Sequence, residues 1–267
     1  MKRIAALLLV ALALPAQTSE LPQQQGTVLI SSGEFPPFTS ETLPRGGFVN
    51  HLISEAFALQ GYRAVFSYMP WQRALREARK GNVQASSYWQ CTEAIQADFV
   101  CSEPLKHEEY VFFYRKDKPI ADWQSYADLR GLKVGVTAGY TYSKGFWQAV
   151  DAGLLQVESV QEDEQNIAKL LRGRLDALLL DPMVAYDLLE RRFAPATSHL
   201  LTFHPRPVAS ITGHLVFSKQ LAEAQTLQRA FDAGLAQMQQ SGRYEQLHDA
   251  LLKGHYSPGT IGDVLPQ

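Results

Sequence analysis

The sequence has little cysteine and no excess of either charge. Its 267 residues include two cysteines, and 25 lysines and arginines balance 27 aspartates and glutamates, giving a net charge of −2. Without a basic excess, no nucleic-acid partner is expected. The seven histidines are scattered and none lies at ligand spacing from a cysteine, so the sequence predicts no metal site. A glycine-rich phosphate loop with its lysine is missing too, and no cofactor is predicted.

The chain also lacks an apolar run long enough to span a bilayer. Ile4–Leu14 is apolar over eleven residues, whereas a spanning helix needs about 20. A basic head, Met1–Arg3, precedes this run, and small and polar residues follow it. This pattern is typical of a secretory signal peptide, here residues 1–20, and predicts a soluble protein exported to the periplasm. A buried N-terminal helix is the alternative.

The two cysteines, Cys91 and Cys101, lie ten positions apart. In an oxidising compartment an isolated pair indicates a disulfide. Two separate buried thiols remain the alternative.

Predicted strands alternate with predicted helices in two consecutive rounds. The first round begins with a strand at Thr27–Ser31 and the second with a strand at Lys133–Thr137. Such alternation indicates two α/β lobes. Because several of these strands are apolar throughout, we expect mostly parallel sheets flanked by helices.

Four loops follow strands at places where a ligand is expected. In open α/β sheets, ligands bind beyond the carboxyl ends of the strands. The loops recur in both halves of the chain, which predicts a cleft between two lobes. They are Ser32–Phe38, Tyr88–Thr92, Ala138–Thr141 and the turn at Asp181.

The order of several short motifs resembles the family 3 extracytoplasmic solute-binding proteins, the polar amino-acid receptors of ABC importers. Each motif is weak alone, but their order and spacing over residues 27–252 are specific. The motifs are Phe35–Phe38 (FPPF), Gly47-Phe48 with Leu52, Trp71, Ser102–Pro104 (SEP), Asp128–Gly131 (DLRG) with Lys133–Val136 (KVGV), Gly173–Ala177 (GRLDA) ending at Asp181, and Gly242–Tyr244 (GRY).

The resemblance implies a type II periplasmic-binding-protein fold with two lobes and two crossover segments. The crossovers are expected near His107–Phe112 and Phe203–Ser210. Lobe 1 is predicted to be discontinuous, residues 27–110 plus 208–255, and lobe 2 to comprise residues 111–207. The implied function is the capture of a small polar solute, such as an amino acid or amine, by a monomer that serves an ABC permease.

The family's binding residues can be transferred by position. Phe35 and Trp71 would pack on the ligand, and Asp181 would receive its ammonium group. The alternative for Asp181 is a helix N-cap before Pro182, and one residue can fill both roles. Ser87, Tyr88, Trp89 and Gln90 would hydrogen-bond the ligand, and Tyr140 and Thr141 would receive its carboxylate.

One departure from the family pattern puts the ligand in question. The family usually pairs an arginine with the α-carboxylate, but Ile95 stands at that position. Arg73 offers a substitute cation, and the amides of Gly139–Thr141 at a helix N-terminus offer another anion site. The third alternative is a ligand without an α-carboxylate, held by Asp181, Glu34 and aromatic faces through cation–π contact.

Two other functions remain as alternatives. A ligand sensor for a membrane signalling protein would use the same fold. A cyclohexadienyl-dehydratase-like enzyme would need a cleft acid, for which Glu34, Glu93 and Asp181 are available. Because the sequence offers no nucleophile–base pairing, we predict a binding protein rather than an enzyme.

Overall fold

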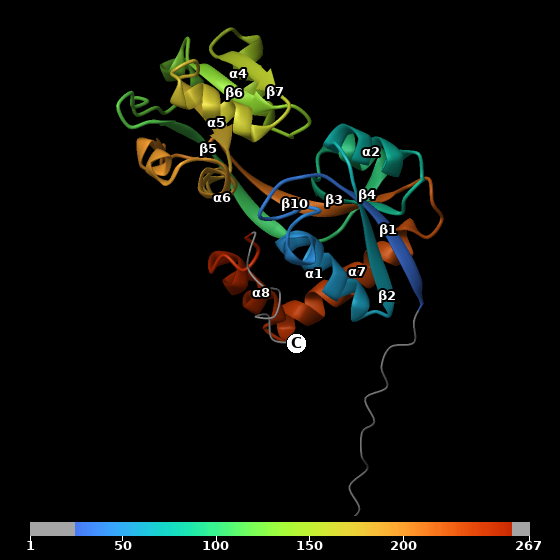
Figure 1. Ribbon diagram of the computed structural model, residues 1–267. Coiled ribbons are helices and arrows are strands. Elements are labelled where there is room, and N and C mark those ends of the chain that lie inside the picture. The colour runs from blue at the N-terminus through green and yellow to red at the C-terminus, as the bar shows by residue number, and fades with distance from the viewer. Residues whose placement is uncertain (1–24, 258–267) are drawn as a thin grey trace, which may run out of the picture.

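The computed structural model describes residues 25–257, so the predicted signal peptide lies outside the described part of the chain. The strands form a sheet in the order β2-β1-β3-β10-β5-β8-β6-β7, while β4 pairs with β10 and β9 with β5 (Figure 1). The strands are β1 (Gly26–Ser32), β2 (Tyr62–Tyr68), β3 (Ala85–Gln90), β4 (Phe99–Cys101), β5 (Lys106–Arg115), β6 (Lys133–Thr137), β7 (Gln156–Val160), β8 (Ala177–Leu180), β9 (Leu201–Phe203) and β10 (Ala209–Ser218).

The first half of the sheet is built on β1, which pairs in parallel with β2 and β3. The helices of this half are α1 (Phe48–Ala58), α2 (Trp71–Arg79), α3 (Glu93–Asp98), α7 (Ala224–Gln240) and α8 (Arg243–Leu252). Helices α1, α7 and α8 contact one another on one face, and α2 packs on the opposite face (Figure 1). The buried side of α1 includes Val49, Leu52, Ile53, Ala56 and Phe57, the helically spaced residues predicted to form it.

The second half repeats this plan around β6, which pairs in parallel with β7 and β8. Its helices are α4 (Lys144–Asp151), α5 (Asp163–Leu171) and α6 (Pro182–Arg192). Short 3₁₀ turns cover Tyr126–Leu129 and Pro195–Leu200 in this half, and Pro44–Gly46 in the first half. The sequence predicted β6 with the same ends, because its apolar run is bounded by turn residues on both sides.

Two long antiparallel strands connect the halves. The first part of β5, Lys106–Tyr110, pairs with β10 in the first half, whereas Val111–Arg115 pairs with β8 and β9 in the second. The chain returns from β9 to β10 through residues 204–208. These passages lie where the two crossovers were predicted, and the two-lobed α/β fold is confirmed. The lobe boundaries, 27–110 with 208–255 and 111–207, stay a prediction.

Within residues 25–257, no helix combines the length and the apolar character needed to cross a membrane.

Candidate functional site

A pocket lies where the two halves meet the crossing strands. It holds about 430 Å³ of space between protein atoms, including its mouth. Both halves and both crossing strands supply its walls. The lining residues are Phe35, Trp71, Tyr88, Trp89, Gln90, Glu108, Tyr110, Gly139, Tyr140, Thr141, Ile211, Thr212 and Gly213.

Trp71 forms one aromatic wall at the start of α2. Its ring lies so close to Gly33 that a Cβ atom there would be 2.4 Å from the indole. The indole Nε1 donates to the Glu34 carbonyl at 3.2 Å, and its ring meets Trp89 edge-on with centroids 5.3 Å apart. A glycine at position 33 is therefore required for the tryptophan to reach the pocket.

Tyr88 reaches the pocket through an unusual backbone conformation. Its φ angle is +64°, in the left-handed region that residues other than glycine rarely adopt. The ring packs on Gly213 of β10, where a Cβ would lie 2.2 Å from it, and on Phe35 and Phe38. Sparsely populated backbone conformations cluster at ligand sites, and here the conformation turns the ring of Tyr88 towards the cleft.

The second half contributes Tyr140, which contacts the first half directly. Its ring lies edge-on to Phe35 with centroids 5.1 Å apart. Its hydroxyl donates to Asp163 at 2.7 Å, and the Thr137 hydroxyl donates to the other oxygen of the same carboxylate. Burial raises the pKa of Asp163, although these two donors act in the opposite direction. The halves are thus in contact across the pocket, and Tyr140 is fixed by a buried network.

Glu108 and Tyr110 lie on β5 and face the pocket, and the sequence did not single out either of them. They are 4% and 6% exposed, whereas their neighbours His107 and Glu109 are exposed. Burial, followed by the charge of Asp181, raises the pKa of Glu108 to about 7. Residues two apart share one side of a strand, but residues 106–110 (KHEEY) show no alternation of apolar and polar types that would have marked this side.

Seven predicted binding residues line the pocket together. They are Phe35, Trp71, Tyr88, Trp89, Gln90, Tyr140 and Thr141.

Three predicted binding residues lie elsewhere. Arg73 is exposed on α2 and is not part of the pocket lining. The Ser87 hydroxyl is fully buried and hydrogen-bonded to that of Ser32 at 2.8 Å. Asp181 is buried at the N-terminus of α6, where it accepts hydrogen bonds from the amides of Met183 and Val184. Asp181 is therefore a helix N-cap, and its role towards a ligand stays a prediction.

At the position where the family has its arginine, this chain has an isoleucine, and the residues around it are apolar too. Ile95 is 7% exposed and belongs to a small hydrophobic cluster that includes Leu75, Trp89 and Phe99. The predicted helix N-terminus at Gly139–Thr141 also differs, because α4 begins at Lys144 with Ser143 as its N-cap. Ser143 rather than a ligand oxygen accepts from a first-turn amide of that helix. Neither Ile95 nor the first turn of α4 therefore offers a partner to a ligand carboxylate, whereas the turn at Gly139–Thr141 itself lines the pocket.

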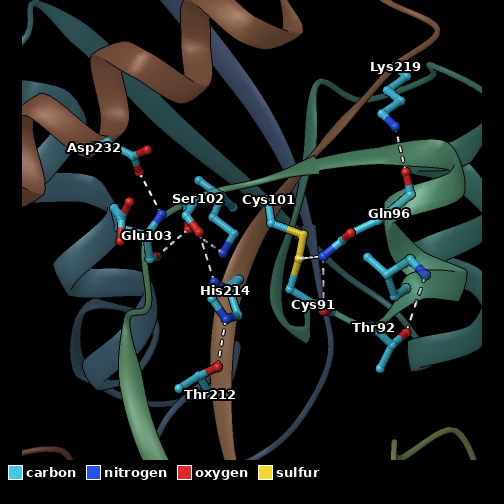
Figure 2. Close-up of a disulfide and its surroundings, with 12 residues drawn as sticks. Cys91, Thr92, Gln96, Cys101, Ser102, Glu103, Thr212, His214, Lys219 and Asp232 are labelled. Atoms are coloured by element: carbon cyan, nitrogen blue, oxygen red, sulfur yellow. Dashed lines mark hydrogen bonds between the residues drawn. A yellow bond between two sulfur atoms is a disulfide. The ribbon is translucent and has the colours of Figure 1, made fainter.

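The two cysteines form a disulfide beside the pocket (Figure 2). Cys91 follows the last residue of β3 and Cys101 ends β4, with Cα atoms 6.2 Å apart. Next to the bridge, His214 of β10 contacts the Ser102 carbonyl at 2.8 Å and the hydroxyl of the pocket residue Thr212 at 2.7 Å. The disulfide therefore joins the ends of two strands close to the pocket wall.

Within the described residues, no group of three or more histidine, cysteine or acidic side chains is arranged to hold a metal ion.

A family profile matches most of the chain and shows which family it belongs to. Residues 28–253 match the profile of the bacterial extracellular solute-binding proteins, family 3. The chain belongs to this family. Family 3 consists of solute-binding proteins, which agrees with the prediction of a binding protein rather than an enzyme, and its extracellular character agrees with export.

Individual relatives are more distant. The L-cystine-binding protein TcyJ of Escherichia coli (strain K12) is 29% identical over 128 residues, which make up 46% of this chain and 42% of the relative. The match thus spans less than half the length of that curated relative. The solute-binding chain is also similar in fold to several solved structures. These include the substrate-binding protein AbpA of Streptococcus pneumoniae bound to L-arginine (TM-score 0.68, 20% identity, 86% of this chain and 96% of that chain). A histidine kinase sensor domain with similarity to periplasmic binding proteins matches as well (TM-score 0.69, 19% identity, 85% and 96%).

Proposed function

We propose that this protein captures a small polar solute, an amino acid, an amine or a related compound, between its two halves in the periplasm. The observation that carries the proposal is the pocket itself. It lies beyond the carboxyl ends of β1, β3 and β6, where ligands of open α/β sheets bind. Phe35 from one half and Tyr140 from the other meet across it.

The route of delivery follows from the family. We propose that an ABC permease receives the solute after the halves close around it, with bending at the crossing strands β5 and β10. The curated relative is named for L-cystine binding, and AbpA belongs to an amino-acid ABC transporter. Both support a solute that carries an amino group.

A membrane sensor is the second candidate receiver, and the likeness to a kinase sensor domain favours it. The pocket would act in the same way, because closure would report the solute instead of releasing it. Co-purification with solubilised membrane proteins distinguishes the two receivers: a permease with its ATPase indicates transport, and a kinase or cyclase indicates signalling.

The test of solute capture is thermal-shift screening of the exported protein against amino acids, amines, sugars and organic acids. A ligand at about 100 times its Kd stabilises the folded state by about 2.7 kcal/mol, which gives a clear rise in Tm. Trp71→Ala should weaken binding of any hit by 10-fold or more. Trp147→Ala is the matched control, because this tryptophan is 39% exposed on α4 and outside the pocket lining. If no compound shifts the Tm, the proposal is wrong.

A further inference from the structure

Glu108 is the acidic side chain of the pocket lining, and it is buried there without a formed ion pair. Among residues 25–257, its carboxylate is not within 4 Å of any lysine, arginine or histidine nitrogen, the separation that defines the ion pairs seen elsewhere in the chain. Lys106 lies two positions earlier on β5, but its Nζ donates to the His107 carbonyl and lies 4.6 Å above the ring of Phe38. Leaving a carboxylate in a dry site without a cation is costly. A protein retains such a group most readily where a ligand supplies the missing charge.

The hydroxyl of Tyr88 is a second buried polar group of the pocket lining, and it lacks a well-formed hydrogen bond. Tyr88 is 8% exposed, and among the described residues its hydroxyl makes no hydrogen bond of good geometry. The hydroxyl faces Glu108, and as a loosely aligned hydrogen-bond donor it lowers the pKa of that carboxyl. Buried hydroxyls are normally hydrogen-bonded, so one without a well-formed bond, beside a carboxylate that has no cation, indicates a place for a polar group of a ligand.

We propose that Glu108 is the counter-charge of the ligand, and that the pocket therefore selects a small organic cation that bears an ammonium group and no carboxylate. This inference rests on the proposed function, since it assigns the ligand class of the same pocket.

The charges around Glu108 favour a cation over a zwitterion. Asp181, the N-cap of α6, adds negative charge and Lys106 opposes it, while the phenols of Tyr88 and Tyr110 stay neutral because burial raises the pKa of each. The lining contains no lysine, arginine or histidine in the described part of the chain. A ligand carboxylate would thus add an uncompensated negative charge near two acids.

The aromatic walls suit an ammonium group in the same way. Trp71, Tyr88, Trp89, Phe35 and Tyr140 all line the pocket. The face of an aromatic ring attracts a cation within about 6 Å of its centroid, and tryptophan does so most strongly. An ammonium group beside Glu108 would therefore gain from both the carboxylate and the rings, whereas an anion would gain from neither.

The pH dependence of binding has a definite sign. Burial and then Asp181 place the pKa of Glu108 near 7 in the empty protein, while an aliphatic amine is already charged at that pH. Binding therefore requires Glu108 to lose its proton, and affinity should rise with pH. We expect binding to be about 10-fold tighter at pH 8 than at pH 6, and nearly constant above pH 8.

The experiment is calorimetric titration of the exported protein with amines and their parent amino acids, so that each pair differs by one carboxylate. Suitable pairs are putrescine and ornithine, agmatine and arginine, histamine and histidine, and phenethylamine and phenylalanine. We expect at least one amine to bind 30-fold or more tightly than its parent. Glu108→Gln should weaken that binding by about 100-fold. The matched control is Glu109→Gln, an exposed glutamate on the opposite side of the same strand.

Each outcome decides something. Amine binding that depends on Glu108 and rises with pH supports the inference. Binding of the amino acids as tightly as the amines, or an unchanged affinity in Glu108→Gln, overturns it and leaves solute capture intact. If no solute of any class binds, the proposed function fails and the inference fails with it. Should Glu108→Gln not fold, the pH profile of the wild-type protein decides alone, and a flat profile overturns the inference.

Discussion

Two glutamates of the first half have opposite surroundings. Glu55 on α1 contacts Arg243 through both oxygens, at 2.7 and 2.8 Å, and His51 at 2.9 Å. Burial raises its pKa, but the hydrogen bonds from Arg243 and His51 outweigh burial and lower the pKa to about 2. Glu108 on β5 lacks such partners, and burial with the nearby Asp181 raises its pKa to about 7.

The opposite pKa shifts distinguish a carboxylate that stabilises the fold, Glu55, from one that is available to a ligand, Glu108. Glu55 connects α1 to α8, it is not part of the pocket lining, and its charge is matched by Arg243 and His51. Glu108 lies on the strand shared by both halves and its charge is matched only weakly. Substituting each by glutamine removes the charge with little change in shape, so the two variants should change stability in opposite directions.

The largest expected effect is a gain of stability in ligand-free Glu108→Gln. The folded-state pKa lies above the unfolded value of about 4.5, so the wild-type protein loses stability as pH rises from about 4.5 to about 7. A shift of this size corresponds to about 3 kcal/mol at pH 8. The variant should be more stable than the wild type by up to that amount at pH 8 and equally stable at pH 4.5, as measured by urea unfolding.

Glu109→Gln is the control for this comparison, and it should change the free energy of unfolding by less than about 0.5 kcal/mol, as surface substitutions usually do. A Glu108→Gln protein that is less stable than the wild type at pH 8 would mean that an unrecognised partner compensates Glu108, and the contrast with Glu55 would disappear.

The second effect is a loss of stability in Glu55→Gln. The lowered pKa means that the carboxylate stabilises the fold above about pH 4.5, and that this contribution is lost as pH falls towards 2. The side chain is 27% exposed, so we discount the shift for solvent screening and expect a loss of about 2 kcal/mol at pH 7. Chemical denaturation at pH 7 and pH 3 measures it, and the loss should be smaller at pH 3.

Glu77→Gln, at a glutamate hydrogen-bonded to Asn82 on the surface of α2, is the matched control for Glu55. It should leave stability nearly unchanged at both pH values. Ligand affinity should be unchanged in both variants. A weaker affinity in Glu55→Gln would show that α1 and the pocket are energetically coupled, and Glu55 would then not be a purely structural acid.

The sequence predicted the fold more fully than it predicted the site. Apolar runs bounded by turns located most strands and helices, because such patterns are local. The short strand β4 was missed, since Phe99–Cys101 is too brief to show a period. The side of β5 that faces the pocket depends on its pairing with β10, which lies about 100 residues later. Glu108 therefore could not be assigned from the run EEYVFFY alone.

The aromatic residues that line the pocket were predictable for a different reason. Phe35 and Trp71 each lie shortly after the end of a strand and next to a proline, so their display in a cleft follows from local geometry. Asp181 was open to two interpretations, because an aspartate before proline suits both a helix cap and an ammonium site. The contacts of Gly33 with Trp71 and of Gly213 with Tyr88 join distant parts of the chain, and no local pattern reveals them.

The smallest expected effect concerns a third acid, the partly buried Asp163, whose surroundings lie between those of Glu55 and Glu108. Tyr140→Phe removes one of its two hydroxyl donors and leaves the hydrogen bond from Thr137. We expect a loss of about 1 kcal/mol in stability and less than a threefold change in ligand affinity, because the ring that meets Phe35 is kept. Tyr62→Phe, at a half-buried ring packed on Phe57, is the control, and thermal unfolding with calorimetric titration measures both quantities. If Tyr140→Phe lowers stability as much as Glu55→Gln does, the hydrogen bond from Tyr140 would be as important to Asp163 as the hydrogen bonds from Arg243 and His51 are to Glu55. Asp163 would then belong with Glu55, as an acid whose charge the protein stabilises, and not between Glu55 and Glu108.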